Sequence, residues 1–341
     1  MATATRESLA QPAVPPRAAA RRPFSRFLTA YLYLLPAFLI MAVITYYPMG
    51  FNVWMSFTDY GLTNLRVNSP PPNIVGLDNY LRILQGDLPI PNFDFLRMLF
   101  FNLWWTFSNV IFHVTIGIII AVLLNIEGLW FRKVYRAIFV LPMVIPALVI
   151  ANVWKNMYDP DYGAVNQLLA SVGSLFGAPA SAFHIRWLES VDHPIPGVPL
   201  PLSYFAMLIT NIWLGWPFMT IVATGALQSI SKDFYEDASI DGASPVQQFF
   251  SITLPLLRPA MIPAAMFGMI TTFNLFHIIY FISGGGPLRE TEILVTTAFR
   301  LVNEQRLYGV AAAFGVYIFF ILLALTVLTN RISRATESYD V

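Results

Sequence analysis

Six long apolar stretches limit what this chain of 341 residues can fold into. They occupy residues 28–57, 99–126, 134–157, 203–228, 259–283 and 307–330. A helix needs roughly 20 apolar residues to cross the hydrocarbon core of a bilayer. Only 11% of the residues are charged, against about 25% in a soluble domain. The sequence therefore predicts an all-α membrane protein with about six transmembrane helices.

Prolines interrupt several of these stretches. Pro36 and Pro48 lie in the first, which is also the longest, so we expect that helix to tilt or kink. Pro142 and Pro146 lie in the third stretch. Proline within a span is tolerated where neighbouring helices satisfy the freed backbone groups.

The basic residues predict the orientation, because Lys and Arg collect in short cytoplasmic loops. With six spans, both termini and the loops after the second and fourth stretches share one side. These segments hold most of the basic residues, namely Arg6, Arg17, Arg21, Arg22, Arg26, Arg132, Lys133, Arg136, Lys232, Arg258, Arg331 and Arg334. We expect this side to be cytoplasmic. Residues 1–27 are expected to form a disordered basic tail, and no signal-peptide cleavage pattern follows it.

A polar segment at residues 231–258 separates the fourth and fifth stretches. Ser231 is a suitable N-cap, and Gly242 suits a left-handed helix stop. Ser244 and Gln247 can form a capping box around Pro245 at the first helical position. The segment therefore predicts two short helices hinged at Gly242. In the second helix, one largely apolar face is expected from Val246, Phe249, Phe250 and Thr253.

Two readings of this segment remain open at this point. It can dock on a soluble partner, or it can lie on the membrane surface as an amphipathic hairpin. Membrane-surface helices usually carry a polar face rich in Lys and Arg, whereas this segment carries Glu236, Asp237 and Asp241. The acidic composition favours the soluble partner.

Glu236-Asp237-Ala238, Gly242 and Ile252-Thr253-Leu254-Pro255 resemble the EAA loop of ABC-importer permeases. Asp237 departs from that pattern, where alanine is usual. Further strings extend the similarity to MalF-type permeases of carbohydrate importers over about residues 28–341. They are Gly76-Leu77-Asp78-Asn79-Tyr80, Trp213-Leu214-Gly215-Trp216-Pro217-Phe218, Phe273-Asn274, Ser283-Gly284-Gly285-Gly286-Pro287 and Tyr308-Gly309-Val310-Ala311-Ala312-Ala313. The loop at 58–98 is too short for the large external domain of the best-known maltose permease.

The resemblance implies roles for particular residues. The EAA loop of the family inserts into a cleft of the ATP-binding subunit, which implies coupling roles for Glu236, Asp237, Ala238, Gly242, Ile252, Leu254 and Pro255. The family's sugar contacts map onto Leu214, Gly215, Phe218, Phe273, Asn274 and His277. Spacing places Asn274 and His277 on one helix face. An interhelical hydrogen bond is the competing role for Asn274, and plain packing is the competing role for Phe218 and Phe273.

The implied protein is a non-catalytic permease subunit of an ATP-driven importer in the cytoplasmic (inner) membrane of a prokaryote. It would translocate a di- or oligosaccharide, such as maltose, maltodextrin or trehalose, by alternating access. The implied partners are a second related permease, two ATP-binding subunits that hold ATP and Mg, and an extracytoplasmic sugar-binding protein. No cofactor is expected in the chain itself, which lacks a Gly-rich phosphate loop. The absence of cysteine excludes thiolate metal sites, and the net charge of +1 gives no indication of nucleic-acid binding.

Three alternatives compete with a sugar importer. A secondary sugar transporter would usually carry ionisable residues at mid-membrane, and the stretches contain almost no acids. A permease for an anionic solute such as glycerol 3-phosphate would favour basic residues in the cavity, and we find none in the fourth and fifth stretches. A membrane-embedded enzyme would need a catalytic pair, and no such pair stands out.

Overall fold

The protein is almost entirely helical over the part that the structure describes. The computed structural model describes the backbone of residues 23–333 and the side chains of residues 31–331. Within these residues the extended structure is limited to an isolated bridge between Thr58 and Ile74. The expected tail at 1–27 lies outside the described residues except for its last five positions. The chain divides into two compact units, residues 1–52 and 53–341.

In the first unit, the described residues 23–52 form one helical stretch. It comprises α1 (Pro23–Met41), a π-helical turn η1 (Ala42–Tyr46) and the start of α2 (Tyr47–Ser56). Pro36 lies inside α1, and the π-turn ends two residues before Pro48. A π-turn is one of the irregularities that helices use around proline. Residues 31–56 are long and apolar enough to cross a membrane.

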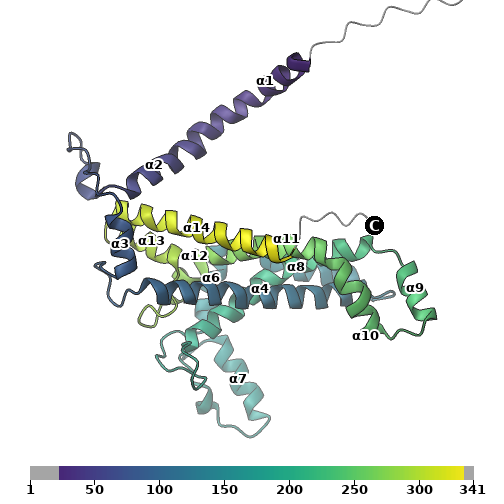
Figure 1. Ribbon diagram of the computed structural model, residues 1–341. Helices are drawn as coiled ribbons and strands as arrows, with labels where there is room; N and C mark the ends of the chain where they lie inside the picture. Colours follow the sequence, from purple (N-terminus) through teal and green to yellow (C-terminus); the bar gives the residue numbers. More distant parts are fainter. Residues whose placement is uncertain (1–22, 334–341) are drawn as a thin grey trace, which may run out of the picture. The chain divides into compact units, whose positions relative to one another are not determined.

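Four long helices lie side by side in the second unit, as Figure 1 shows. They are α4 (Phe95–Asn125), α8 (Leu202–Ser229), α11 (Leu254–Phe273) and α14 (Tyr308–Ser333). Gly117 lets α4 approach α8 closely, because a Cβ at this position would lie 2.5 Å from the Cβ of Met219. The buried residues Trp105, Tyr204 and Met207 fill the interface further along. This helical bundle confirms the predicted fold class.

The third predicted stretch is not one straight helix. It forms α5 (Arg132–Val144) and α6 (Ala147–Met157), which are bent by 96°. Ile145 is extended, with φ −77° and ψ 132°, because the residue before a proline avoids the helical region. Within the described residues, five helices are long and apolar enough to span a membrane, and six if the bent pair counts as one span.

The fifth predicted stretch, 259–283, is wrong at both ends. Helix α11 starts at Leu254 and continues without a break from α10 (Pro245–Gln248) and a π-turn η4 (Phe249–Thr253). It ends at Phe273, where Asn274 and Leu275 leave the helical conformation. A short α12 (Phe276–Ile278) and a π-turn η5 (Ile279–Ser283) follow.

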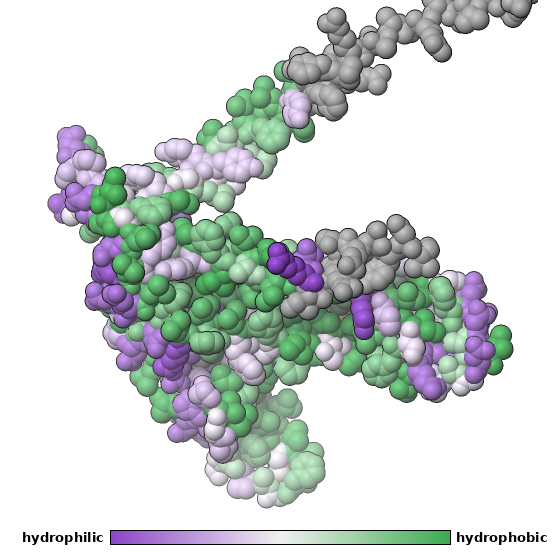
Figure 2. Space-filling view, viewed as in Figure 1, coloured by the Kyte–Doolittle hydropathy of each residue, from purple (hydrophilic) through white to green (hydrophobic). Residues whose placement is uncertain are grey.

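Shorter elements occupy the two ends of the bundle. At one end lie η2 (Leu62–Leu65), α3 (Asp78–Gln85) and α13 (Leu294–Asn303), with α7 (Ala164–Ser174) and η3 (Ala180–Phe183) in a further loop. Helix α9 (Asp233–Ile240) and α10 lie at the other end (Figure 1). Hydrophilic residues gather at these ends, and hydrophobic residues cover the flank between them (Figure 2). This distribution suits a protein whose flank faces lipid.

Candidate functional site: a coupling segment and a substrate path

The hinge at Gly242 has the conformation that the sequence predicts. Gly242 has φ +81°, and it ends α9 by donating its N–H to the Ser239 carbonyl at 3.1 Å. The Ala243 N–H reaches back to the Ala238 carbonyl at 2.9 Å. These two bonds satisfy carbonyls that a helix end leaves free. The chain then turns sharply towards α10.

The second helix starts as predicted but does not end as a short helix. The Ser244 N–H donates to Gln247 Oε1 at 2.8 Å, and the Gln247 N–H donates to Ser244 Oγ at 3.3 Å, which completes the capping box. Helix α10 then continues through η4 into the long helix α11, which begins at Leu254 and Pro255. The expected separate helix is therefore the first part of the long apolar helix that continues as α11.

Side chains fix α9 to this extended helix. Gln248 Nε2 donates to Ser239 Oγ at 2.9 Å and to the Ala243 carbonyl at 3.1 Å. The Tyr235 hydroxyl lies 3.0 Å from Thr253 Oγ1. These bonds join the two arms of the hinge on both sides of Gly242. Helix α9 and the start of α11 can therefore move as one body.

An ion pair ties the start of α9 to the end of α4. Lys232 hydrogen-bonds to Glu127, which lowers the pKa of Glu127 and raises the pKa of Lys232. Both side chains are exposed. Lys232 and Glu236 line an open cavity of about 790 Å³ between α9 and the ends of α4 and α8.

The hinged segment presents charged and apolar side chains together. Glu236, Asp237 and Gly242 are exposed, whereas Ala238, Ile252, Leu254 and Pro255 are half-buried. Large apolar side chains with more than half of their surface exposed are Phe234, Ile240, Val246 and Phe250. The predicted single apolar face of the second helix is divided, because Phe249 is half-buried and Thr253 is buried. The exposed half of that face is typical of a surface that a protein partner covers.

On α8, the structure places the three candidate sugar contacts between neighbouring helices. Leu214, Gly215 and Phe218 are all half-buried. A Cβ on Gly215 would lie 2.2 Å from Cε1 of His113, whose Nε2 is 2.8 Å from the Asn211 carbonyl. Gly215 therefore has a packing role between α4 and α8. The Phe218 ring packs on Phe267 with a centroid distance of 5.6 Å.

Phe273 lies inside the core instead of facing a path. Its side chain is fully buried, and its carbonyl accepts a hydrogen bond of 3.1 Å from Asn102 Nδ2. Asn102 Oδ1 in turn accepts the Leu294 N–H at 3.0 Å. The side chain of Asn102 therefore joins α4 to the end of α11 and the start of α13. The Phe273 ring would reach a sugar only if this core opened.

Asn274 and His277 do not share one helix face. Asn274 ends α11 with φ −99° and ψ 22°, and Leu275 with ψ 73° separates it from α12. Asn274 Nδ2 donates back to the Ile270 carbonyl at 3.2 Å. Both residues are half-buried, and Nε2 of His277 is buried without a hydrogen-bond partner. A buried polar atom without a partner costs free energy, so His277 is the stronger candidate for binding a ligand.

An aromatic cluster beside His277 was not singled out from the sequence. The rings of Phe276 and Tyr280 stack at 4.8 Å, and Phe299 packs on Phe276 at 4.7 Å. All three are at least partly exposed. The spacing of Phe276 and Tyr280, four residues apart, was the available signal. Phe299 comes from α13, and only the folded structure brings it here.

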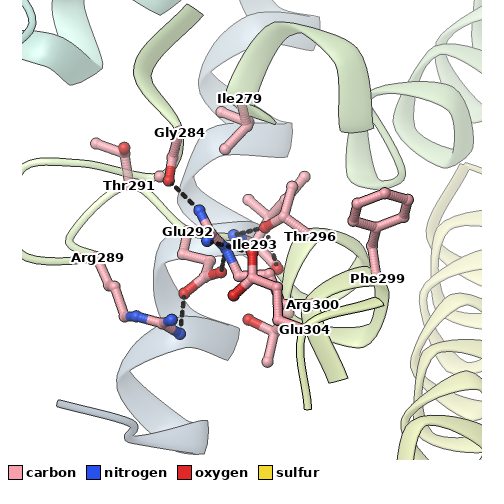
Figure 3. A network of polar contacts seen from close by, with 12 residues as sticks. Ile279, Gly284, Arg289, Thr291, Glu292, Ile293, Thr296, Phe299, Arg300 and Glu304 are labelled. Carbon is pink, nitrogen blue, oxygen red and sulfur yellow. Dashed lines mark hydrogen bonds and ion pairs between the residues drawn. The ribbon is translucent and has the colours of Figure 1, made fainter. Parts of the chain in front are cut away.

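A buried carboxylate anchors the loop that follows this cluster. Glu292 is 1% exposed, and it pairs with Arg289 at 3.1 Å and with Arg300 at 2.9 Å. Figure 3 shows Arg300 between Glu292 and Gly284, to whose carbonyl it donates at 2.6 Å. Arg300 also lies 5.5 Å from the centre of the Tyr280 ring. Burial raises the pKa of Glu292, and the charges of Arg289 and Arg300 oppose that rise.

Residues 113–338 match the model of the family described as binding-protein-dependent transport system inner membrane component. A relative from Thermococcus litoralis, the trehalose/maltose transport system permease protein MalF, is 33% identical over 304 residues, which cover 89% of this chain and 93% of the relative. The chain belongs to this family of transport-system inner membrane components. The resemblance to MalF-type permeases is thereby confirmed.

Other members show how far the likeness extends. The maltodextrin transport system permease protein MdxF of Bacillus subtilis is 29% identical over 326 residues, covering 91% of this chain and 70% of the relative. A solved structure of a bacterial ABC transporter involved in the import of the acidic polysaccharide alginate matches with a TM-score of 0.73 and 22% identity. The match covers 92% of this chain and 98% of that chain. At that identity the match supports the shared fold.

Proposed function

We propose that this inner membrane component is a permease subunit of an ATP-driven sugar importer. The observation that carries the proposal is the hinged segment from α9 to α10, whose acidic and apolar side chains are exposed at one end of the bundle. The segment runs without interruption into α11, and the chain belongs to a family of transport-system permeases. A segment of this kind provides a surface that a soluble partner can bind.

The geometry suggests how a movement of α9 would be transmitted to the candidate sugar site. Helix α11 has 20 residues, which corresponds to about 30 Å of rise. The turns that lead into α11 are tied to α9, because Gln248 of α10 bonds to Ser239 and Thr253 of η4 bonds to Tyr235. Helix α11 itself ends immediately before Asn274. Movement of α9 by a closing ATPase would therefore displace the region of Asn274 and His277. Alternating access then follows if the rest of the bundle does not move with α11.

ATP would be bound and hydrolysed by partner subunits. Two ATP-binding subunits would hold ATP and Mg, a second related permease would complete the path, and an external protein would deliver the sugar. The relatives are named as permease proteins of transport systems, and one solved neighbour is described in complex with a substrate-bound periplasmic protein. The basic residues favour a cytoplasmic position for α9 and for both termini.

Sugar chemistry suits the groups near the break after α11. Sugars bind through aromatic rings against their apolar faces and through polar groups at their hydroxyls. Phe276, Tyr280 and Phe299 provide rings, and His277 provides an unsatisfied polar atom. An anionic solute such as glycerol 3-phosphate is less suited, because α8 contains no basic residue and Arg300, the cation beside Tyr280, is already paired with Glu292 and Glu304. The names of the relatives favour maltose, maltodextrin or trehalose as the sugar.

Reconstitution of the chain with its co-purifying subunits tests this proposal. Sugars that bind should stimulate ATP hydrolysis, and Gly242→Asp or Glu236→Ala should separate hydrolysis from uptake. Sugar uptake by the chain alone, without ATP, would contradict the proposal and indicate a secondary transporter.

A further inference from the structure

A second cavity lies between α5 and α8, about 310 Å³ in volume. Ligand cavities usually measure roughly 300–1,000 Å³. Its polar lining includes Arg136 from α5 with Thr224 and Gln228 from α8. Its apolar lining includes Phe139 from α5 and Ile221 from α8. None of these residues belongs to the coupling segment or to the candidate sugar contacts.

Arg136 is not satisfied by the protein. Its Nε and Nη2 atoms are buried and have no hydrogen-bond partner. Leaving such charged groups unpaired in a buried position is costly, so basic side chains within membrane segments normally find a partner. Within the described residues, Arg132, Lys133 and Arg136 form no ion pair. The nearby carboxylate of Glu127 is exposed and pairs with Lys232.

The position of these three charges at the start of α5 is unfavourable unless an anion binds there. Arg132, Lys133 and Arg136 lie in the first turns of the helix, whose N-cap residue, Phe131, makes no side-chain cap. A helix N-terminus carries a partial positive charge and favours negative groups. Three cations at this end therefore repel the helix dipole as well as one another. Arg132 donates only one described side-chain hydrogen bond, to Asn125.

The lining changes from polar to apolar along the cavity. On α5, Phe139 and Val140 lie about one turn further into the helix than Arg136. On α8, which runs the opposite way, Ile221 lies one to two turns before Thr224 and Gln228. Arg136, Thr224 and Gln228 therefore share the end near the loops, and Phe139, Val140 and Ile221 share the inner end. Thr220 also lines the inner end, but its hydroxyl donates to the Trp216 carbonyl. This gradient matches an amphiphile with an anionic head and a hydrocarbon chain, and it differs from the aromatic and polar lining that a sugar requires.

We propose that this cavity binds the phosphate of an anionic phospholipid, with Arg136 as the principal ligand. Thr224 and Gln228 supply further donors to the phosphate oxygens, and the acyl chain lies along Phe139 and Ile221. Basic pockets between transmembrane helices on the cytoplasmic side bind acidic lipid headgroups in this way. The placement on the cytoplasmic leaflet rests on the orientation in the proposed function. A lipid here would hold α5, the first half of the bent pair, against α8.

Native mass spectrometry of the full chain, purified with its companion subunits, tests this proposal. Phosphatidylglycerol is titrated into delipidated protein, and the bound lipid is counted directly. Arg136→Gln should weaken binding at one site by about tenfold or more, the change expected from losing a hydrogen bond to a charged group. Arg331→Gln is the matched control, since it removes an exposed arginine from α14 on the same proposed side. It should bind as the unchanged chain does.

A second variant and a competition with inorganic phosphate complete the test. Ile221→Trp fills the apolar part of the cavity and leaves Arg136 in place, so it should also abolish the site even if Arg136→Gln fails to fold. Inorganic phosphate should not displace the lipid, and displacement would assign the site to a soluble phosphate instead. Equal lipid binding by the unchanged chain and by both cavity variants would overturn the proposal. Lipid counting requires neither sugar transport nor a known orientation, so a failure of the proposed function gives a different result.

Discussion

Gly242→Ala is the sharpest perturbation of the hinge. The residue has φ +81°, a conformation that costs an ordinary L-residue roughly 1–2 kcal/mol. A Cβ at Gly242 would meet nothing within 4 Å, so the backbone conformation is the only penalty. A cost of this size lowers the ratio of the bent to the straightened segment by a factor of about 5–30. Gly242→Asn should cost less, because asparagine tolerates the left-handed region.

The assay is sugar transported per ATP hydrolysed in proteoliposomes that contain the co-purified importer. We expect the ratio to fall for Gly242→Ala and to fall less for Gly242→Asn. Gly177→Ala is the matched control, because Gly177 has φ +78° and equally open surroundings but lies in the loop after α7, away from α9 and α10. It should carry the same local strain without affecting coupling. A full transport ratio for Gly242→Ala would refute the hinge as the coupling element.

Three further predictions concern the bundle and the substrate path. Gly215→Ala should destabilise the packing of α4 on α8 by about 1–3 kcal/mol, because its Cβ would overlap His113, and thermal denaturation in detergent measures the loss. Glu292→Ala should cost about 3–5 kcal/mol, because it leaves two arginines without their shared carboxylate, and Glu292→Gln should restore part of the loss in the same assay. His277→Ala should raise the KM for the transported sugar with little change in thermal stability, and an unchanged KM would remove His277 from the sugar site.

The sequence predicted the long helices well, because length and apolar composition are local properties. The stretch predicted at 203–228 differs by one residue at each end from α8, Leu202–Ser229. The hinge was also predictable, since Gly242 and the Ser244–Gln247 capping box are read from neighbouring residues. The resemblance to a permease family rested on the same local strings.

The breaks within spans could not be predicted in the same way. The chain bends by 96° between α5 and α6, at Pro146. A helix that contains a proline often remains continuous within a membrane, so the presence of Pro146 did not predict the bend. The end of α11 at Phe273 is fixed partly by Asn102, which is 171 residues away in the sequence. Glu292 was overlooked because a charged loop residue is usually solvated, and its burial depends on α13.

Single-cysteine cross-linking tests most directly whether the segment around α9 docks on an ATPase. The chain contains no cysteine, so Ile240→Cys and Phe176→Cys each introduce a unique thiol. The two side chains are 84% and 86% exposed and are both apolar, and they lie on α9 and in the loop after α7. We expect Ile240→Cys to cross-link to the co-purifying ATP-binding subunit, and Phe176→Cys not to do so. Labelling of Ile240→Cys from outside intact cells, with no cross-link to an ATPase, would contradict the coupling role of this segment.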